Sequence, residues 1–246
     1  MSEPAVVVRD LRFRYKKSPR LVLDGIELAI AAGARCLVIG ANGAGKSTLL
    51  RVIGGKHMVD HETVRVLGAS AFHDTWLAGD VELLGGNFPF NIDLRVAEML
   101  AHAVDVDPAR RDRLVALLGV DPEWHMQAVS DGQRRRVQLL MGLMRPRKLL
   151  LLDEVTTDLD LLARQDLLAF LREESEERGA TILYATHIFD TLDEWATHLV
   201  YLVAGRVHTF APLSEIPELE AWKARTTTPL LHLVEAWLRR DTRSRI

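Results

Sequence analysis

The chain has 246 residues, of which 48% are hydrophobic and 26% are charged, and its formal net charge at pH 7 is −3. This composition excludes a disordered or low-complexity protein, and the small negative charge gives no argument for a nucleic-acid partner. The single cysteine, Cys36, excludes a disulfide scaffold and favours a reducing compartment. Because we find neither a signal-peptide pattern nor an apolar run of about 18 residues, we expect a soluble intracellular protein without membrane insertion.

The N-terminal part alternates apolar and polar residues as β-strands do. We expect short strands over residues 5–8, 11–15 and 21–30, with breaks at Arg9-Asp10 and Asp24-Gly25. A nearly continuous apolar run over 34–39 is typical of a strand buried on both faces. A glycine-rich turn and a helix over 47–53 follow, and further strands are expected over 64–67 and 81–84.

Helical spacing replaces strand spacing between about residues 87 and 145. Val96, Met99, Leu100 and Val104 fit one helix face, and Asp107-Pro108 and Ser130 are typical helix starts. Beyond this segment we expect strands over 149–152 and 181–185, a helix over 159–174, and an edge hairpin over 199–203 and 207–210. An amphipathic helix over 229–239 ends the pattern, with one apolar face formed by Leu230, Leu233, Val234 and Trp237. The pattern predicts one α/β unit that carries an inserted helical subdomain.

The glycine-rich turn matches the phosphate-binding pattern G-x-x-x-x-G-K-[ST] in full, over residues 40–47. Glycines allow successive backbone N–H groups to point at phosphate oxygens, and the following helix adds a favourable partial positive charge. Lys46 is expected to reach the β- and γ-phosphates, and the Ser47 hydroxyl to ligate Mg²⁺. The nucleotide-binding set expected here is Gly40, Asn42, Gly43, Ala44, Gly45, Lys46, Ser47 and Thr48.

Two acids follow the apolar strand over 149–152, at the strand end where open α/β sheets bind ligands. Asp153 suits the Mg²⁺ shell, largely through water. Glu154 is placed to polarise the water that attacks the γ-phosphate.

These motifs together resemble those of the ATP-binding-cassette (ABC) ATPases. The family signature L-S-G-G-Q stands here as Val129-Ser130-Asp131-Gly132-Gln133, and the family's dimer-contact loop as Thr157-Asp158-Leu159-Asp160. Thr186-His187 matches the switch histidine, and Tyr15 the aromatic residue that stacks on adenine. The resemblance implies that Ser130, Gly132 and Gln133 bind nucleotide, that Asp158 and Asp160 contact a second chain, and that Lys46, Glu154 and His187 serve catalysis.

A closer resemblance is visible to the soluble ABC ATPases found in fungi with the carbon-catabolite-repression deadenylase and transcription complex, and to the plant non-intrinsic ABC proteins. It extends over 129–138, 153–160, 184–190 and the C-terminal segment. It implies a P-loop NTPase fold with an antiparallel β-subdomain and an inserted helical subdomain. The ABC domain would cover residues 1–210, with the helical subdomain at about 87–145, and a C-terminal helical extension would cover 211–246.

The function implied is a cytoplasmic or nuclear ATPase that uses ATP and Mg²⁺, forms a homodimer and drives a conformational change in a protein partner. One alternative is the ATP-binding subunit of a membrane transporter whose transmembrane chain is separate. A second alternative is a nucleotide-gated binding module with little turnover, against which Glu154 and His187 count.

Three positions depart from the usual cassette. Gly86 takes the place of a glutamine that couples transporters to their membrane subunit, with Asn87 one residue away. Asp131 replaces a signature glycine, and its carboxylate repels a triphosphate unless it points away or is paired. Val155 replaces a proline, which we expect to be harmless.

Other chemistry-bearing residues fit surface or core roles better than sites. His57, Asp60, His61 and His73 show no closed ligand set, so a surface role is expected. Cys36 is expected to be a buried apolar residue. The run Arg134-Arg135-Arg136 is interpreted as a solvated or dimer-facing patch. The basic C-terminal residues Arg239, Arg240, Arg243 and Arg245 belong to a helix that we expect to pack on the protein's own core.

Overall fold

A six-stranded sheet forms the centre of the computed structural model, which describes residues 3–86 and 93–243. Its strand order is β10-β9-β3-β8-β7-β6, and all neighbours are parallel except the β9–β10 hairpin at one edge. The strands are β3 (Arg35–Gly40), β6 (Val81–Gly85), β7 (Leu149–Asp153), β8 (Thr181–Ala185), β9 (His198–Val203) and β10 (Arg206–Pro212).

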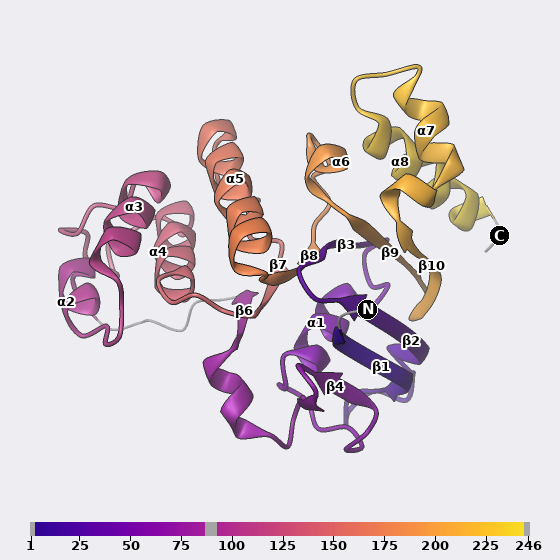
Figure 1. The fold of residues 1–246 in the computed structure, drawn as a ribbon, viewed down its shortest axis with the longest axis horizontal. Coiled ribbons are helices and arrows are strands. Elements are labelled where there is room, and N and C mark those ends of the chain that lie inside the picture. The colour runs from indigo at the N-terminus through magenta and orange to yellow at the C-terminus, as the bar shows by residue number, and fades with distance from the viewer. Residues whose placement is uncertain (1–2, 87–92, 244–246) are drawn as a thin grey trace.

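A four-stranded antiparallel sheet, ordered β2-β1-β4-β5, lies below the central sheet beside helix α1 (Figure 1). Its strands are β1 (Pro4–Phe13), β2 (Leu23–Ala31), β4 (Val64–Val66) and β5 (Ala69–Ser70), and α1 spans Lys46–Ile53. The expected breaks in the first two strands are wrong, because β1 and β2 are each continuous. Residues 8–11 of β1 instead form a bulge against β2, with Asp10 and Gly25 at positive φ.

The other α-helices cover the opposite face of the central sheet or extend beyond one edge of it (Figure 1). Helices α2 (Val96–Ala101), α3 (Pro108–Leu118) and α4 (Asp131–Leu143) lie together at the β6 edge. Helices α5 (Leu161–Arg178) and α6 (Leu192–Trp195) lie over the sheet. Helices α7 (Pro217–Lys223) and α8 (Pro229–Arg243) lie near its β9–β10 edge. Two short 3₁₀ helices, η1 (Thr75–Gly79) and η2 (Leu213–Glu215), complete the order.

The central strands are buried on both faces, as their apolar runs predict, and they divide the core into two parts. Leu37 and Ile39 of β3 pack on the helical side, whereas Cys36 and Val38 pack on the side of α1 and the antiparallel sheet. This division follows from the two-residue repeat of a strand. The interpretation of Cys36 as a buried residue is confirmed, since its side chain has no exposed surface.

The caps that the sequence predicts are present in the structure. The Asp107 carboxylate accepts from the Ala109 N–H at the start of α3, and Ser130 caps α4. Val104 is wrong as a helix position, because α2 ends at Ala101 and the Val104 side chain is 64% exposed. The C-terminal helix packs on the core as expected, since Leu230, Leu233, Val234 and Trp237 of α8 are all buried.

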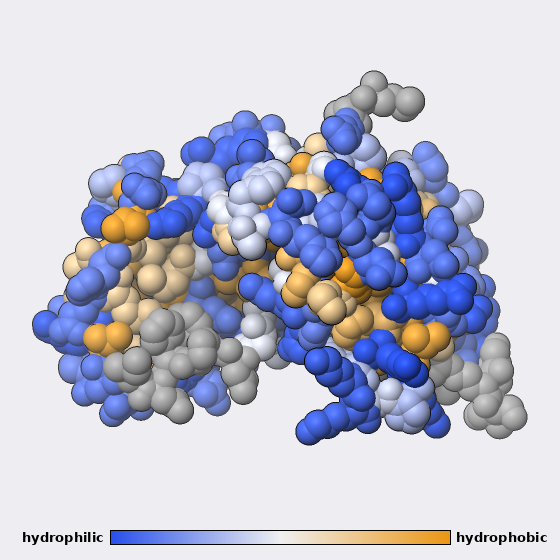
Figure 2. Space-filling view, turned by 90° about the horizontal axis from the view of Figure 1, so that it is seen from below, coloured by the Kyte–Doolittle hydropathy of each residue, from blue (hydrophilic) through white to orange (hydrophobic). Residues whose placement is uncertain are grey.

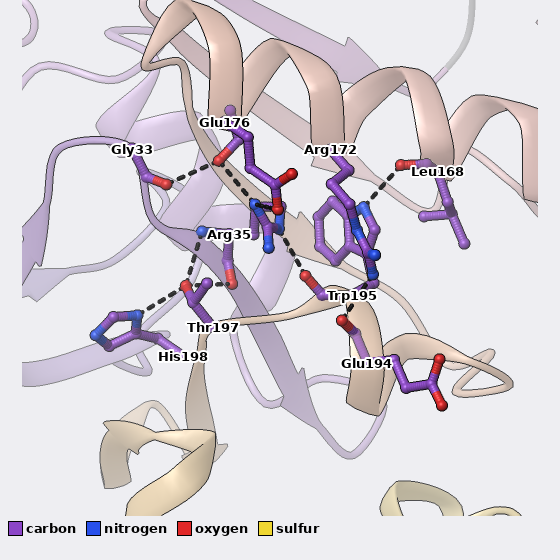
Figure 3. Close-up of polar contacts among 10 residues, drawn as sticks. Gly33, Arg35, Leu168, Arg172, Glu176, Glu194, Trp195, Thr197 and His198 are labelled. Carbon is purple, nitrogen blue, oxygen red and sulfur yellow. Dashed lines mark hydrogen bonds and ion pairs between the residues drawn. The ribbon is translucent and has the colours of Figure 1, made fainter.

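A buried arginine fixes the start of β3, the strand that leads into the phosphate loop. Arg35 donates from Nε to the Trp195 carbonyl (2.6 Å) and from Nη1 to the Ser175 hydroxyl (3.2 Å). Its Nη1 also lies 3.0 Å from a Glu176 carboxylate oxygen, so that β3 is tied to both α5 and α6 (Figure 3). Because this guanidinium is charged and nearly enclosed, each of its partners matters for the stability of the fold.

The surface seen from below is mainly hydrophilic, and its hydrophobic residues lie in small separate patches (Figure 2). Within residues 3–86 and 93–243, no helix combines the length and the apolar character needed to cross a membrane.

Candidate active site

The phosphate loop connects β3 to α1 through a backbone that only glycine adopts without strain. Gly45 has φ +108, and a Cβ atom there would lie 2.8 Å from Leu23 Cδ2. Gly40 has φ +152, and its Cβ atom would lie 2.4 Å from the carbonyl oxygen of Leu202. The loop is therefore pressed against β2 and β9 at two points, and any side chain at either glycine would force it to shift.

Lys46, the first residue of α1, lies back across this loop. Its Nζ donates to the carbonyl oxygens of Gly40 (2.8 Å) and Ala41 (3.4 Å). Burial lowers the pKa of Lys46, and the nearby carboxylates of Glu154 and Asp153 oppose that effect. A partly desolvated cation beside the N-terminus of a helix is suited to a phosphate anion.

Ser47 and Asp153 bring two oxygen donors together from separate elements. The Ser47 hydroxyl at the start of α1 donates to Asp153 Oδ1 at the end of β7 (2.9 Å). Hydroxyl and carboxylate oxygens are the ligands that Mg²⁺ prefers, and Mg²⁺ is usually bound by few protein groups together with water and substrate phosphates. The residue types and their proximity therefore fit the expected metal.

Glu154 follows β7 with a backbone that is uncommon for its residue type, at φ +54. Its N–H donates to the Ala185 carbonyl (2.9 Å), which holds this turn against the end of β8. Its carboxylate Oε2 accepts from the His187 backbone N–H (3.3 Å) and lies 2.8 Å from His187 Nδ1. Left-handed backbone at a non-glycine residue costs free energy and occurs often at functional sites.

Tyr15 lies beside α1, the helix that follows the phosphate loop. Its hydroxyl is 3.1 Å from the Thr48 hydroxyl, and its ring makes edge contacts with Phe13 (5.2 Å between centroids) and His57 (5.3 Å). The structure thus places Tyr15 against α1, the helix that carries Lys46, Ser47 and Thr48. Asn42, Gly43 and Ala44 lie in the intervening loop, where Ala44 is buried and the other two are exposed.

The signature residues form the N-terminal cap of α4. The Ser130 hydroxyl accepts from the Gln133 N–H (3.2 Å), and Gln133 Oε1 accepts from the Ser130 N–H (2.9 Å). This capping box occupies both side chains within the chain. Asp131 lies in the first turn, where the helix dipole stabilises a carboxylate.

The loop that holds Asp158 and Asp160 is bound to α4 of the same chain. Asp160 caps α5 by accepting from the Ala163 N–H (2.9 Å), and its other oxygen accepts from Arg136 Nη2 (2.6 Å). Asp158 lies 3.7 Å from Arg135 Nε. Arg135 and Arg136 thus pair with carboxylates of the same chain, contacts that sequence reasoning missed. A dimer-facing role for the arginine run stays a prediction. No local sequence pattern gives these contacts, because Asp158 and Asp160 lie far from the arginine run in the sequence.

The residues set aside as sites show no metal cluster. His61 and His73 stack on each other (5.3 Å between centroids), and the described part of the chain has no group of three His, Cys, Asp or Glu side chains suited to a metal. Burial and the neighbouring Arg51 cation lower the pKa of His57. Asn87 lies outside the described residues, whereas Gly86 is described and has φ +67.

Comparison with known proteins assigns the class to which this fold and site belong. The family model described as ABC transporter matches residues 23–157, which is more than half of the chain. The chain therefore belongs to the ABC transporter family, and the resemblance seen in its motifs is confirmed.

Individual relatives agree with the narrower resemblance. The chain is 48% identical to ABC transporter I family member 21 of Arabidopsis thaliana over 97% of this chain and 87% of that protein. It is 44% identical to family member 20 of the same plant, over 96% and 76%. CCR4-associated factor 16 of Saccharomyces cerevisiae is 39% identical over 84% of this chain and 78% of that protein.

Solved structures confirm the predicted fold class. The structure of an ATP-binding subunit of an ABC transporter superposes with a TM-score of 0.77 at 24% identity and covers 96% of this chain and 99% of its own. A dimeric ATP-binding cassette in a post-hydrolysis state, bound to ADP and Pi, gives a TM-score of 0.72 at 20% identity, over 85% and 98%.

Proposed function

We propose that this chain binds and hydrolyses Mg²⁺-ATP in a homodimer that encloses two nucleotides, and that the cycle drives a conformational change in a protein partner. The observation that carries the proposal is the Glu154–His187 pair, which joins the ends of β7 and β8 beside Asp153 and Lys46. A carboxylate held by a histidine next to a phosphate loop is placed to orient and polarise an attacking water.

Each proposed residue has a role that follows from its place. Lys46 and the loop N–H groups neutralise the β- and γ-phosphates, and Tyr15 offers a ring to the adenine. Ser47 and Asp153 hold Mg²⁺, which supplies charge neutralisation at the phosphates when bound. Glu154 accepts the hydrogen bond of the attacking water, and His187 holds the Glu154 carboxylate and faces the γ-phosphate.

The dimer is proposed because the nucleotide-binding residues fall into two groups. Ser47 of α1 contacts Asp153 at the end of β7, and Lys46 precedes Ser47 on the same helix. Ser130 and Gln133 instead contact each other at the start of α4, and Gly132 lies against Asp158. A two-fold axis would place Ser130 and Gly132 of one chain on the γ-phosphate bound by the other chain, in an isologous interface. Asp158 and Asp160 then lie at the contact.

A protein partner outside a membrane is favoured over a transporter subunit by position 86. Gly86 has φ +67, a conformation in which a glutamine would be strained. The glutamine that couples transporters to their membrane subunit is therefore missing here, and the backbone at this position does not favour it. The name of the yeast relative, CCR4-associated factor 16, also points to association with another protein. The partner and any role in gene regulation belong to this proposal.

Phosphate release from ATP by the purified chain tests the proposal. Wild-type protein should hydrolyse ATP without any added membrane chain, and Glu154→Gln should abolish release. Glu218→Gln is the matched control, because Glu218 is an exposed acid on α7 and the exchange should leave the rate unchanged. Activity that appeared only after reconstitution with an integral membrane protein would establish the transporter alternative instead.

A further inference from the structure

Arg135 contacts two segments that flank the acids Asp153 and Glu154. It belongs to α4, and its side chain is 17% exposed. Its Nη1 donates to the Gly86 carbonyl (3.1 Å) and to Gln138 Oε1 (2.5 Å), while its Nε lies 3.7 Å from an Asp158 carboxylate oxygen. The Nε makes no hydrogen bond within the described residues, so its interaction with Asp158 is one of charge at close range.

The first of these segments is the end of β6, which lies directly against Asp153. Gly85 is the partner of Asp153 in the parallel β6–β7 pair, and a Cβ atom on Gly85 would come within 2.6 Å of Asp153 Cβ. Gln138 Nε2 donates to the Gly85 carbonyl (3.4 Å). Two adjacent carbonyls beside Asp153 are therefore held by side chains of α4.

The second segment is the loop after Glu154. The Thr157 hydroxyl donates to the Glu154 carbonyl (3.2 Å), and Asp158 follows Thr157 directly. Gly132 is pressed against the same loop, since its Cβ atom would lie 3.3 Å from the Asp158 carbonyl oxygen. We therefore expect a movement of α4 to displace the loop after Glu154 as well.

We propose that Arg135 is a positioning residue, which couples the placement of the signature helix α4 to the placement of Asp153 and Glu154. This inference rests on the proposed ATPase function. Gly86 has no side chain to contact the site, and Arg135 supplies a link to the same loop from α4. The planar guanidinium can donate to a carbonyl and lie beside a carboxylate at the same time, which a lysine ammonium on a flexible stem does poorly.

The coupling acts on hydrolysis and leaves nucleotide binding to the phosphate loop. Within the described residues, the side chain of Arg135 forms its hydrogen bonds and its ion pair with Gly86, Gln138 and Asp158, and none of them with residues 40–48. Its loss should therefore lower kcat with little change in KM or in nucleotide affinity, because misplacement of reacting groups costs rate even when binding is intact.

Steady-state ATP hydrolysis by four proteins tests this proposal: wild type, Arg135→Ala, Arg135→Lys and the control Arg145→Ala. Arg145 donates from Nε and Nη2 to the Val104 carbonyl (3.0 and 2.6 Å), so the control also removes an arginine that holds a backbone carbonyl. That carbonyl belongs to the loop after α2, which is not one of the segments that flank Asp153 and Glu154. We expect Arg135→Ala to lower kcat at least tenfold with KM within twofold, Arg135→Lys to recover less than half of the loss, and Arg145→Ala to match wild type. Should Arg135→Ala fail to fold, Arg135→Lys, which keeps the charge and the stem, carries the comparison.

A double-mutant cycle with Asp158→Ala separates positioning from general destabilisation. The double variant should lose no more kcat than the more damaged single variant, because both exchanges break the same link. Wild-type kcat in Arg135→Ala, losses that multiply in the double variant, or an equal loss in Arg145→Ala would each overturn the proposal while leaving the ATPase function in place. A wild-type chain that binds ATP and does not hydrolyse it would contradict both proposals.

Discussion

Lys46 shows how one side chain serves both the loop and its expected ligand. Its ammonium group spans the Gly40 and Ala41 carbonyls, and the carboxylates of Glu154 and Asp153 raise its pKa against the effect of burial. The two acids therefore offset part of the effect that burial has on the pKa of Lys46. A γ-phosphate would take over that pairing, which makes Lys46 the main source of attraction for the triphosphate.

Lys46→Ala should weaken ATP binding at least 100-fold, which corresponds to about 2.7 kcal/mol. Titration calorimetry with Mg²⁺-ATP measures this directly. Lys56→Ala is the matched control, because Lys56 is an exposed lysine just beyond the end of α1 and its loss should leave the affinity unchanged. Equal affinities for wild type and Lys46→Ala would contradict the assignment of the phosphate loop.

Cys36 gives a second test at the residue scale. Burial in β3 raises the pKa of its thiol to about 12, so at pH 8 almost none of the thiolate that reacts with alkylating reagents is present in the folded protein. Iodoacetamide should leave Cys36 unmodified in native buffer and modify it fully in urea, as measured by mass spectrometry. Rapid modification of the native protein would contradict the buried placement.

At the scale of elements, a buried ion pair joins the helices at the β6 edge to the helices over the sheet. Arg110 of α3 donates from Nη1 and Nη2 to the two Glu174 carboxylate oxygens of α5 (2.6 and 2.8 Å) and from Nε to the Leu143 carbonyl (2.8 Å). The guanidinium also lies 4.9 Å from the centre of the Phe170 ring. Both side chains of the pair are at most 6% exposed, so neither is solvated when its partner is lost.

Arg110→Met should lower the free energy of unfolding by about 3 kcal/mol, because it leaves Glu174 buried with Arg178 as its remaining cation. The double variant Arg110→Met, Glu174→Met should regain most of that loss, since apolar replacements of buried pairs are often neutral. Urea unfolding measures both values. Arg113→Met, which breaks the exposed Arg113–Glu173 pair one turn away, should cost less than about 1 kcal/mol. If Arg110→Met lowered the free energy of unfolding as little as Arg113→Met, the buried pair would not stabilise the contact between α3 and α5.

The elements also show what sequence patterns can and cannot predict. The strands that became β3, β7 and β8 and the caps Asp107 and Ser130 were predictable, because continuous apolar runs and local capping residues determine them. The bulge in β1 was not, because a register shift depends on the pairing with β2. In the candidate site, motif spacing located Lys46, Asp153 and Glu154, whereas the Arg135 contacts depend on Gly86 and Asp158, which lie far from it in the sequence.

At the scale of the whole molecule, the two groups of nucleotide-binding residues determine how the protein would work. The phosphate loop and its acids lie at the central sheet, whereas Ser130 and Gly132 lie at the start of α4, in the group of helices at the β6 edge (Figure 1). In the proposed dimer, ATP joins the sheet of one chain to α4 of the other. The division at residue 210 and the subdomain at about 87–145 stay predictions, as does a cytoplasmic or nuclear location.

In the proposed dimer, nucleotide binding would link association to hydrolysis, because two ATP molecules would become part of the interface. Removal of the γ-phosphate would release the chains, and this movement is what a partner protein would sense. Asp131 would oppose this closure, since its carboxylate is exposed beside Ser130 and would bring negative charge toward the triphosphate.

Light scattering on Glu154→Gln is the most direct test of this account. The amide keeps the shape of the side chain but polarises water poorly, so ATP should stay bound and trap the closed state. With saturating Mg²⁺-ATP the account predicts a mass twice the 27.6 kDa of one chain, and with ADP the mass of a single chain. A single-chain mass in Mg²⁺-ATP, with binding confirmed by calorimetry on the same sample, would contradict the proposed dimer and favour a nucleotide-gated binding module.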